Sequence, residues 1–251
     1  MIRVEGLVKT YGKFTAVNGI DLHVPRGELF GFLGPNGAGK TTTLRMIAGI
    51  MRPTAGRIWL GGDDLLTDPM SAKTRLGFIP DRPFIYEKLT GAEFLRFVAG
   101  LFRQDGDIIE KRIDELLEVF ELSMWKHELV ESYSHGMRQK VIIASALVHR
   151  PEVIVVDEPM VGLDPRSAKL LKVLFRQFVD HGGTILMSTH TLEVAEAMCD
   201  RIAIIQNGNI VASGTMDELR QQTQEGLSLE DLFLRLTGGE EAKELSAVLG
   251  E

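Results

Sequence analysis

Residues 34–42 read GPNGAGKTT and fit the phosphate-loop pattern, in which two glycines five positions apart are followed directly by a lysine and a threonine. Glycine-rich turns allow consecutive backbone N–H groups to point at phosphate oxygens, and a helix that follows adds the free donors of its first turn. Lys40 would carry the positive charge for the terminal phosphates, and the hydroxyl of Thr41 would bind Mg²⁺. The pattern therefore predicts a site for a nucleoside triphosphate. Its predicted contact residues are Gly34, Asn36, Gly37, Ala38, Gly39, Lys40, Thr41 and Thr42.

Two acids, Asp157 and Glu158, follow an apolar run in EVIVVDEP (152–159) that reads as a buried strand. Because ligands of parallel sheets collect at the carboxyl ends of the strands, both acids are expected beside the phosphates. Asp157 is predicted to hold Mg²⁺, and Glu158 to polarise an attacking water as general base. His190 ends another predicted strand, 183–190, and is expected to donate a hydrogen bond to the terminal phosphate. The predicted catalytic residues are thus Glu158, His190 and Lys40.

The stretch SYSHGMRQK (132–140) looks like a second anion site, because Ser134 can cap a helix and Gly136 lets a ligand approach the backbone. Arg138 and Lys140 follow in the same helix. Four other histidines lack any such context and are expected at the surface: His23, His127, His149 and His181.

Short apolar runs alternate with helical patterns, which predicts an α/β fold with a largely parallel sheet. Three shorter strands before residue 62 are expected to form an antiparallel flap, and residues 201–214 a hairpin. Between the loop and the acidic strand we predict a helical insert, about 84–150, which opens with a Thr90–Glu93 capping box. Two apolar helix faces in the insert are interpreted as core packing: Phe94, Phe97, Val98 and Leu101, then Ile113, Leu116, Leu117 and Phe120.

The composition of the 251 residues suits a globular protein of one or two domains. A net charge of −7 argues against a nucleic-acid binder, which usually carries a basic stripe. The single cysteine, Cys199, excludes an internal disulfide. No signal peptide is expected at the N-terminus, and no segment reaches the roughly 18 apolar residues that span a bilayer. The glycine fingerprint of dinucleotide-binding oxidoreductases is also absent.

In their order along the chain, these motifs resemble the nucleotide-binding subunit of ABC transporters, over residues 1 to about 220. SHGMRQ (134–139) is similar to the family's signature, GLDP (162–165) to its D-loop, and STH (188–190) to its switch histidine. The resemblance implies a P-loop NTPase (RecA-like) core with an antiparallel β subdomain and an inserted α-helical subdomain. Residues 221–251 would form a C-terminal helical extension, with Leu229, Leu232, Phe233 and Leu236 on one face, and an acidic tail.

The resemblance also implies how the two anion sites are used. Ser134 and Gly136 would close over the γ-phosphate held by a second subunit, and Asp164 would contact that subunit near its phosphate loop. Tyr11 would stack on adenine, with Val17 nearby.

Two positions depart from the family pattern. His135 stands inside the signature, and Asp81 stands where the family has a glutamine that senses the γ-phosphate. A carboxylate still binds a metal-held water but cannot donate a hydrogen bond as an amide does. Asp81 therefore joins Thr41 and Asp157 as a predicted metal-site residue, and its sensing role is in doubt.

The function that the resemblance implies is ATP binding and hydrolysis by a subunit that dimerises on ATP, with Mg²⁺, to drive a separate transmembrane permease. The form YSHGMRQK resembles bacterial ABC-2-type exporters, so export is expected. The subunit would be cytoplasmic and peripheral on the inner face of the cell membrane. Two alternatives stay open: a soluble ABC-type ATPase acting on ribosomes or nucleic acid, and a nucleotide-binding regulator without transport.

Overall fold

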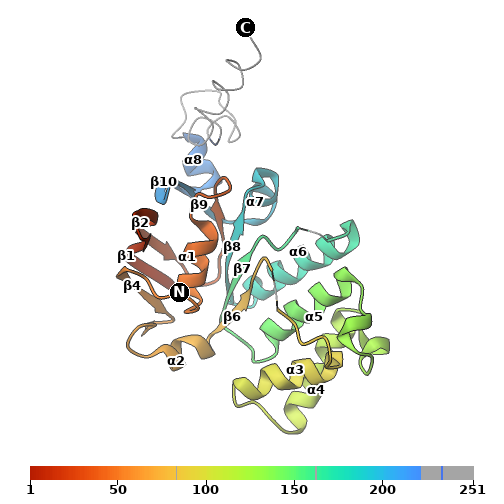
Figure 1. The fold of residues 1–251 in the computed structure, drawn as a ribbon. Coiled ribbons are helices and arrows are strands. Elements are labelled where there is room, and N and C mark those ends of the chain that lie inside the picture. Colours follow the sequence, from red (N-terminus) through yellow and green to blue (C-terminus); the bar gives the residue numbers. More distant parts are fainter. Residues whose placement is uncertain (83, 162, 222–232, 234–251) are drawn as a thin grey trace.

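The computed structural model describes residues 1–82, 84–161, 163–221 and 233, and a six-stranded sheet forms its centre (Figure 1). The strands of this sheet are β3 (Leu29–Leu33), β6 (Leu76–Ile79), β7 (Val153–Asp157), β8 (Thr184–Thr189), β9 (Arg201–Gln206) and β10 (Asn209–Thr215). Their order is β10-β9-β3-β8-β7-β6, and all neighbours pair in parallel except β9 and β10. The predicted α/β class and the predicted strands at β3, β7 and β8 are confirmed.

A second, antiparallel sheet of four strands has the order β2-β1-β4-β5. Its strands are β1 (Ile2–Tyr11), β2 (Phe14–Val24), β4 (Ala55–Leu60) and β5 (Asp63–Asp64). The predicted antiparallel flap is thus confirmed. The predicted hairpin at 201–214 is β9 and β10, and its turn residues Asn207 and Gly208 both have positive φ, 48° and 77°. Two consecutive positive φ angles define the tight turn that suits the twist of a hairpin.

Alternation along the central strands divides the core into two layers. Phe30 and Phe32 of β3 point to the side that the antiparallel sheet and helix α1 (Lys40–Ile47) cover. Leu29 and Leu33 point to the opposite side, where α6 (Pro165–Asp180) and α7 (Leu192–Met198) pack. Strands buried on both faces in this way show no polar alternation, which is why their sequences read as continuous apolar runs. Two short helices complete this part of the fold: α2 (Pro69–Thr74) and α8 (Met216–Gln221).

The helices α3 (Gly91–Leu101), α4 (Asp107–Val119) and α5 (His135–Leu147) form a group beside the central sheet (Figure 1). Two 3₁₀ turns, Ser123–Trp125 and Val130–Ser132, lie between α4 and α5. The capping box is confirmed: the Glu93 N–H donates to Thr90 Oγ1 (3.2 Å), and the Thr90 N–H donates to the Glu93 carboxylate (2.8 Å). The apolar face of α4 is buried as predicted.

The predicted buried face of α3 is partly wrong. Phe97 and Leu101 are 42% and 64% exposed, and Ala92, Leu95 and Ala99 are buried instead. Helix α3 contacts both α4 and α5. Ala92 and Ala99 are small enough to allow a close approach to both neighbours, and Phe97 and Leu101 face outward. The pattern did not reveal this because α3 is apolar around most of its circumference.

His149 is also misplaced by the sequence interpretation, since it is buried rather than at the surface. Its ring stacks on Phe102 with the centroids 3.6 Å apart, and its Nε2 lies 3.0 Å from the carbonyl oxygen of Leu76, which can only accept. Burial lowers the pKa of His149, which favours the neutral ring. His149 therefore joins the helical insert to β6 as a structural residue.

Most of the predicted C-terminal extension lies outside the described residues, including Leu229, Leu232 and Leu236. Phe233 is described and packs against the core cluster that contains α6 and α7. Within the described ranges, no helix has the length and apolar character that crossing a membrane requires.

Candidate functional site

The phosphate loop connects the end of β3 to the start of α1 and depends on two glycines that no other residue could replace. A side chain at Gly34 would lie 2.3 Å from the carbonyl oxygen of Ile205. One at Gly39, where φ is +110°, would lie 2.5 Å from the carbonyl oxygen of Ala16. Gly39 is the N-cap of α1 and offers no side-chain acceptor, so the first-turn N–H groups of the helix remain available to an anion.

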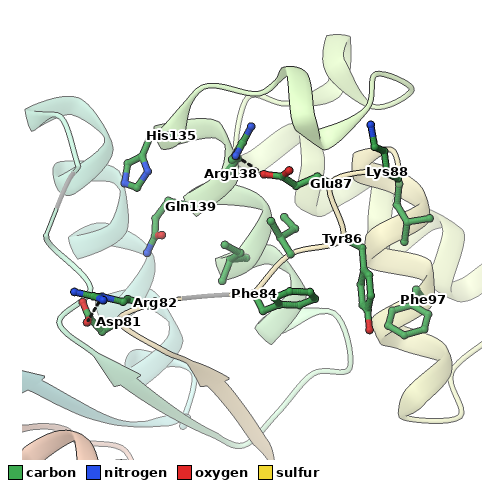
Figure 2. A pocket seen from close by; sticks show the side chains of 13 residues that line it. Asp81, Arg82, Phe84, Tyr86, Glu87, Lys88, Phe97, His135, Arg138 and Gln139 are labelled. Carbon is green, nitrogen blue, oxygen red and sulfur yellow. Dashed lines mark hydrogen bonds and ion pairs between the residues drawn. The ribbon is translucent and has the colours of Figure 1, made fainter.

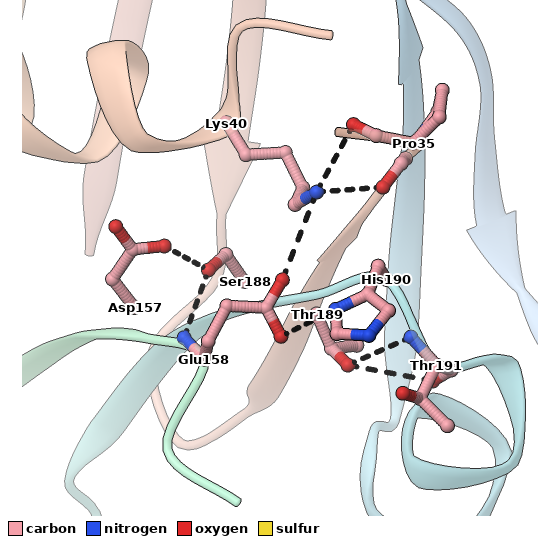
Figure 3. A network of polar contacts seen from close by, with 9 residues as sticks. Pro35, Lys40, Asp157, Glu158, Ser188, Thr189, His190 and Thr191 are labelled. Carbon is pink, nitrogen blue, oxygen red and sulfur yellow. Dashed lines mark hydrogen bonds and ion pairs between the residues drawn. The ribbon is translucent and has the colours of Figure 1, made fainter. Parts of the chain in front are cut away.

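Lys40 reaches back over this loop (Figure 3). Its Nζ donates to the carbonyl oxygens of Gly34 (2.6 Å) and Pro35 (3.2 Å) and lies 3.7 Å from Glu158 Oε1. The side chain is only 6% exposed. Burial lowers the pKa of Lys40, while the charges of Glu158 and Asp157 oppose that shift. The ammonium group is thus held by two carbonyl oxygens and by Glu158, at the place where phosphates are expected.

Glu158 lies between Lys40 and His190, at the carboxyl end of β7 (Figure 3). Its Oε2 is 3.0 Å from His190 Nδ1, and its side chain is 14% exposed. Its backbone φ is +51°, which is uncommon for a residue with a side chain and occurs preferentially at functional sites. The backbone N–H donates to Ser188 Oγ (3.1 Å), and this bond helps to hold the turn. Lys40 and His190 therefore both contact the carboxylate of Glu158.

Asp157 is 2% exposed and accepts a hydrogen bond from Ser188 Oγ. Ser188 thus positions both acids, a role that the sequence interpretation missed. Asp81 follows β6, which pairs in parallel with β7. Asp81 and Asp157 therefore lie at the same end of the sheet, where the carboxyl ends of the strands meet. Thr41 lies in the first turn of α1, and its hydroxyl is, like the carboxylates of Asp157 and Asp81, an oxygen donor of the type that Mg²⁺ prefers. Of the three, Thr41 and Asp81 line the cavity described next, and Asp157 is not among its described lining residues.

A cavity of about 600 Å³ opens over the loop. Among the residues that the structure describes, those lining it are Tyr11, Phe14, Ala16, Pro35, Asn36, Gly37, Gly39, Lys40, Thr41, Thr42, Asp81, Arg82, Glu158, Val161 and His190. The motifs thus bring most of the predicted site residues to one place. The cavity is also lined by residues that were not predicted: Phe14, Ala16, Pro35, Arg82 and Val161.

Three residues that were predicted to contact the nucleotide are not among the described residues that line this cavity. Val17 is fully buried in the core beneath the antiparallel sheet, and Ala16 lines the cavity instead. The N–H of Ala38 donates to the carbonyl oxygen of Pro35 (3.2 Å). Gly34 lies against Ile205 and supports the loop through its carbonyl oxygen.

Ser134, Gly136 and Asp164 form a second group. Ser134 caps α5 by accepting from the Met137 N–H (3.3 Å), and Gly136 has open space where a side chain would be, with Asp164 Oδ2 at 4.0 Å. Asp164 caps α6, and hydrogen bonds from Ser167 lower the pKa of Asp164. None of the three is among the described residues that line the cavity of Lys40.

The cations that follow Ser134 are already engaged. Arg138 donates to the carbonyl oxygens of Tyr133 (3.1 Å) and Glu131 (2.8 Å) and to the carboxylate of Glu87 (2.6 Å). Lys140 lies 3.7 Å from Glu121. The anion-binding capacity of this group therefore rests on Ser134 and the backbone at Gly136.

Residues 17–161 match the model of a protein family described as ABC transporter. The chain is an ATP-binding subunit of the ABC transporter family. The daunorubicin resistance ATP-binding protein DrrA3 of Streptomyces coeruleorubidus is 39% identical over 237 residues, which cover 94% of this chain and 74% of that protein.

Two solved structures agree with this membership. A structure of an ATP-binding subunit of an ABC transporter has a TM-score of 0.88 at 35% identity and covers 94% of this chain and 99% of its own. A dimeric ATP-binding cassette in a post-hydrolysis state, bound to ADP and Pi, has a TM-score of 0.79 at 25% identity, with 86% and 98% covered. The activity of this ABC subunit is hydrolysis of ATP coupled to transport.

Proposed function

We propose that this ABC subunit acts as a homodimer that holds ATP between the phosphate loop of one copy and the Ser134–Gly136 backbone of the other. The observation that carries the proposal is the separation of two anion sites on one chain. Lys40 lines one cavity, whereas Ser134 and Gly136 are not among its described lining residues. The open space beside Gly136 lies next to the carboxylate of Asp164. A chain that needed only its own loop would have no use for the second site. A symmetric pair of chains, in contrast, would complete two equivalent sites.

In each site we assign the following roles. The ammonium group of Lys40 leaves the loop carbonyls and binds the terminal phosphates, together with the first-turn N–H groups of α1. Glu158 accepts a proton from the attacking water, and His190 donates to the γ-phosphate. Tyr11 contacts adenine. Thr41, Asp157 and Asp81 would hold Mg²⁺, which supplies charge neutralisation for the phosphates when bound.

A mixing experiment tests the shared site. Lys40→Met removes the loop cation, and Gly136→Asp places a negative charge in the second site, where the space for a side chain is open. Each variant alone should be inactive. An equal mixture should recover about a quarter of wild-type ATPase activity, because half of the dimers are mixed and each then has one intact site. If the mixture stayed inactive although mixed dimers formed, the shared site would be wrong.

The partner that we propose is a separate membrane permease, and its cytosolic segment would bind a second cavity of about 970 Å³. Figure 2 shows Phe84, Tyr86 and Phe97 along one side of this cavity. Phe84 is 80% exposed, and Tyr86 makes edge-to-face contacts with both other rings (5.3 and 5.2 Å). This second cavity is thus an open groove with an aromatic wall, a shape that suits an amphipathic helix. Asp81 and Arg82 line both this groove and the nucleotide cavity, so the two sites share a wall.

Phe97→Asp is expected to prevent capture of the permease in detergent extracts while leaving the ATPase activity of the isolated subunit within twofold of wild type. The reason is that a charge on the aromatic wall would have to be desolvated on binding. The matched control is Ile108→Asp, on α4 at 79% exposure and outside the groove. If both variants captured the permease equally well, the groove would not be part of the interface with the permease.

Export as the direction of transport is part of this proposal. It is supported by the form YSHGMRQK and by the name of DrrA3 as a resistance protein. The proposed location is cytoplasmic, at the inner face of the cell membrane. A role on ribosomes or nucleic acid is not favoured, since the net charge is −7 and the described site lacks a basic stripe.

A further inference from the structure

Phe14 begins strand β2 and is 63% exposed, yet it lines the cavity above the phosphate loop. The aromatic pairs and cation contacts among the described residues do not involve it. When a ligand covers a large apolar ring that is otherwise exposed to water, the burial of the ring stabilises the complex. The contacts described so far therefore do not explain why an exposed aromatic ring stands at position 14.

Tyr11 and Phe14 are opposite each other in the β1–β2 ladder, on either side of the turn. Residues directly opposite in an antiparallel pair point to the same face, with their Cβ atoms about 4.5–5.5 Å apart. Both side chains line the same cavity. The hairpin therefore presents two aromatic rings together, and not one.

The surroundings of Tyr11 fix its ring and leave that of Phe14 free. The Tyr11 hydroxyl donates to Met51 Sδ at 2.9 Å. Lys9 Nζ lies 5.3 Å from the centre of the Tyr11 ring and also donates to the carbonyl oxygen of Arg52 at 2.8 Å. One face of the Tyr11 ring is thus covered by a cation that is itself held in place.

The hairpin also lies directly against the phosphate loop. The carbonyl oxygen of Ala16 occupies the space that a side chain at Gly39 would need. The Asn18 N–H donates to the carbonyl oxygen of Gly208 in the β9–β10 turn (2.9 Å), and the Gly208 N–H donates in turn to the carbonyl oxygen of Ala38 in the loop (2.9 Å). Triphosphate bound by the loop would therefore place its base toward this hairpin. The base is a flat aromatic group that stacks on aromatic side chains.

We propose that Phe14 is a second base-contacting residue, which holds the adenine ring of ATP together with Tyr11. The inference rests on ATP binding in the cavity of Lys40. Phe14 then contributes to the affinity for ATP through the base, and it contributes nothing to the binding of the phosphates.

The test measures binding of ATP and of inorganic tripolyphosphate, which lacks base and ribose, to the full chain. Phe14→Ala should weaken ATP binding about tenfold, from the usual strength of base–aromatic stacking, and leave tripolyphosphate binding unchanged. Phe14→Tyr should retain the wild-type ATP affinity. Ile50→Ala is the matched control, because Ile50 is also 63% exposed but lies outside the cavity lining.

An unchanged ATP affinity in Phe14→Ala would overturn the proposal. So would an equal loss for both ligands, since it would indicate a distorted loop instead of a lost base contact. A wild-type chain that bound neither ligand would refute the ATP site itself, and with it the role of Phe14. Failure of the mixing experiment, in contrast, would leave the binding results for Phe14 unaffected.

Discussion

Glu158→Gln is expected to lower ATP turnover by about 100-fold or more and to leave ATP binding intact. A general base contributes roughly 10²–10⁴ in rate, and an amide cannot accept the proton of water at neutral pH. Glutamine keeps the size of the side chain, and its amide oxygen can still accept from His190 Nδ1, which lies 3.0 Å from the carboxylate. The cavity and the contacts of its loop should therefore persist.

The same variant should form a stable dimer with ATP. In the proposed function, the γ-phosphate bridges the loop of one copy and the Ser134–Gly136 backbone of the other, and hydrolysis removes that bridge. When hydrolysis is blocked, the closed state persists. Size-exclusion chromatography with and without ATP measures this, and turnover is measured by phosphate release.

Glu118→Gln is the matched control, because Glu118 is exposed on α4, far along the chain from the loop. It should hydrolyse ATP as the wild type does. If Glu158→Gln retained turnover within a few-fold of wild type, Glu158 would not be the base, and its contacts with Lys40 and His190 would have to serve structure alone.

Lys40→Met is expected to weaken ATP binding about 100-fold. Each hydrogen bond to a charged partner contributes about 1.5–3 kcal/mol, and Lys40 would make more than one such bond to the phosphates. Methionine fills similar space without the charge. Calorimetry or the ATP-dependent shift in melting temperature measures the loss.

A second effect of Lys40→Met concerns the unliganded chain. Glu158 is 14% exposed and would lose the cation 3.7 Å away, while keeping His190. Because the carboxylate retains one partner and some water, the fold should survive the substitution. Arg45→Met, in the last turn of α1, is the control and should bind ATP normally. ATP affinity that is equal in the two variants would contradict the role of Lys40.

The local motifs of the chain could be predicted from the sequence because their residue types are required by local geometry. Gly39 must be glycine since its φ is +110° and the carbonyl oxygen of Ala16 occupies the space of a side chain. Asp157 and Glu158 follow a short apolar run that is typical of a buried strand and forms one, and the carboxyl end of such a strand is where ligands bind. The Thr90–Glu93 capping box is equally local.

Tertiary structure decided which neighbours of these motifs face the site. Along β2 a shift of one residue changes the face, so Val17 points into the core while Phe14 and Ala16 line the cavity. On α3, close packing by Ala92 and Ala99 turned Phe97 outward into the groove. Ser188 touches both acids only because β8 pairs with β7.

The phosphate loop, and the places of Asp157, Glu158 and His190 at the carboxyl ends of their strands, could therefore be predicted from the sequence alone, because short-range geometry restricts those residues. Which side chains line the cavity of Lys40 and the groove, and that Ser134 and Gly136 lie outside that cavity, depended on the packing of elements distant in the chain. Packing of that kind is set by the shapes of many side chains at once, and no local pattern encodes it.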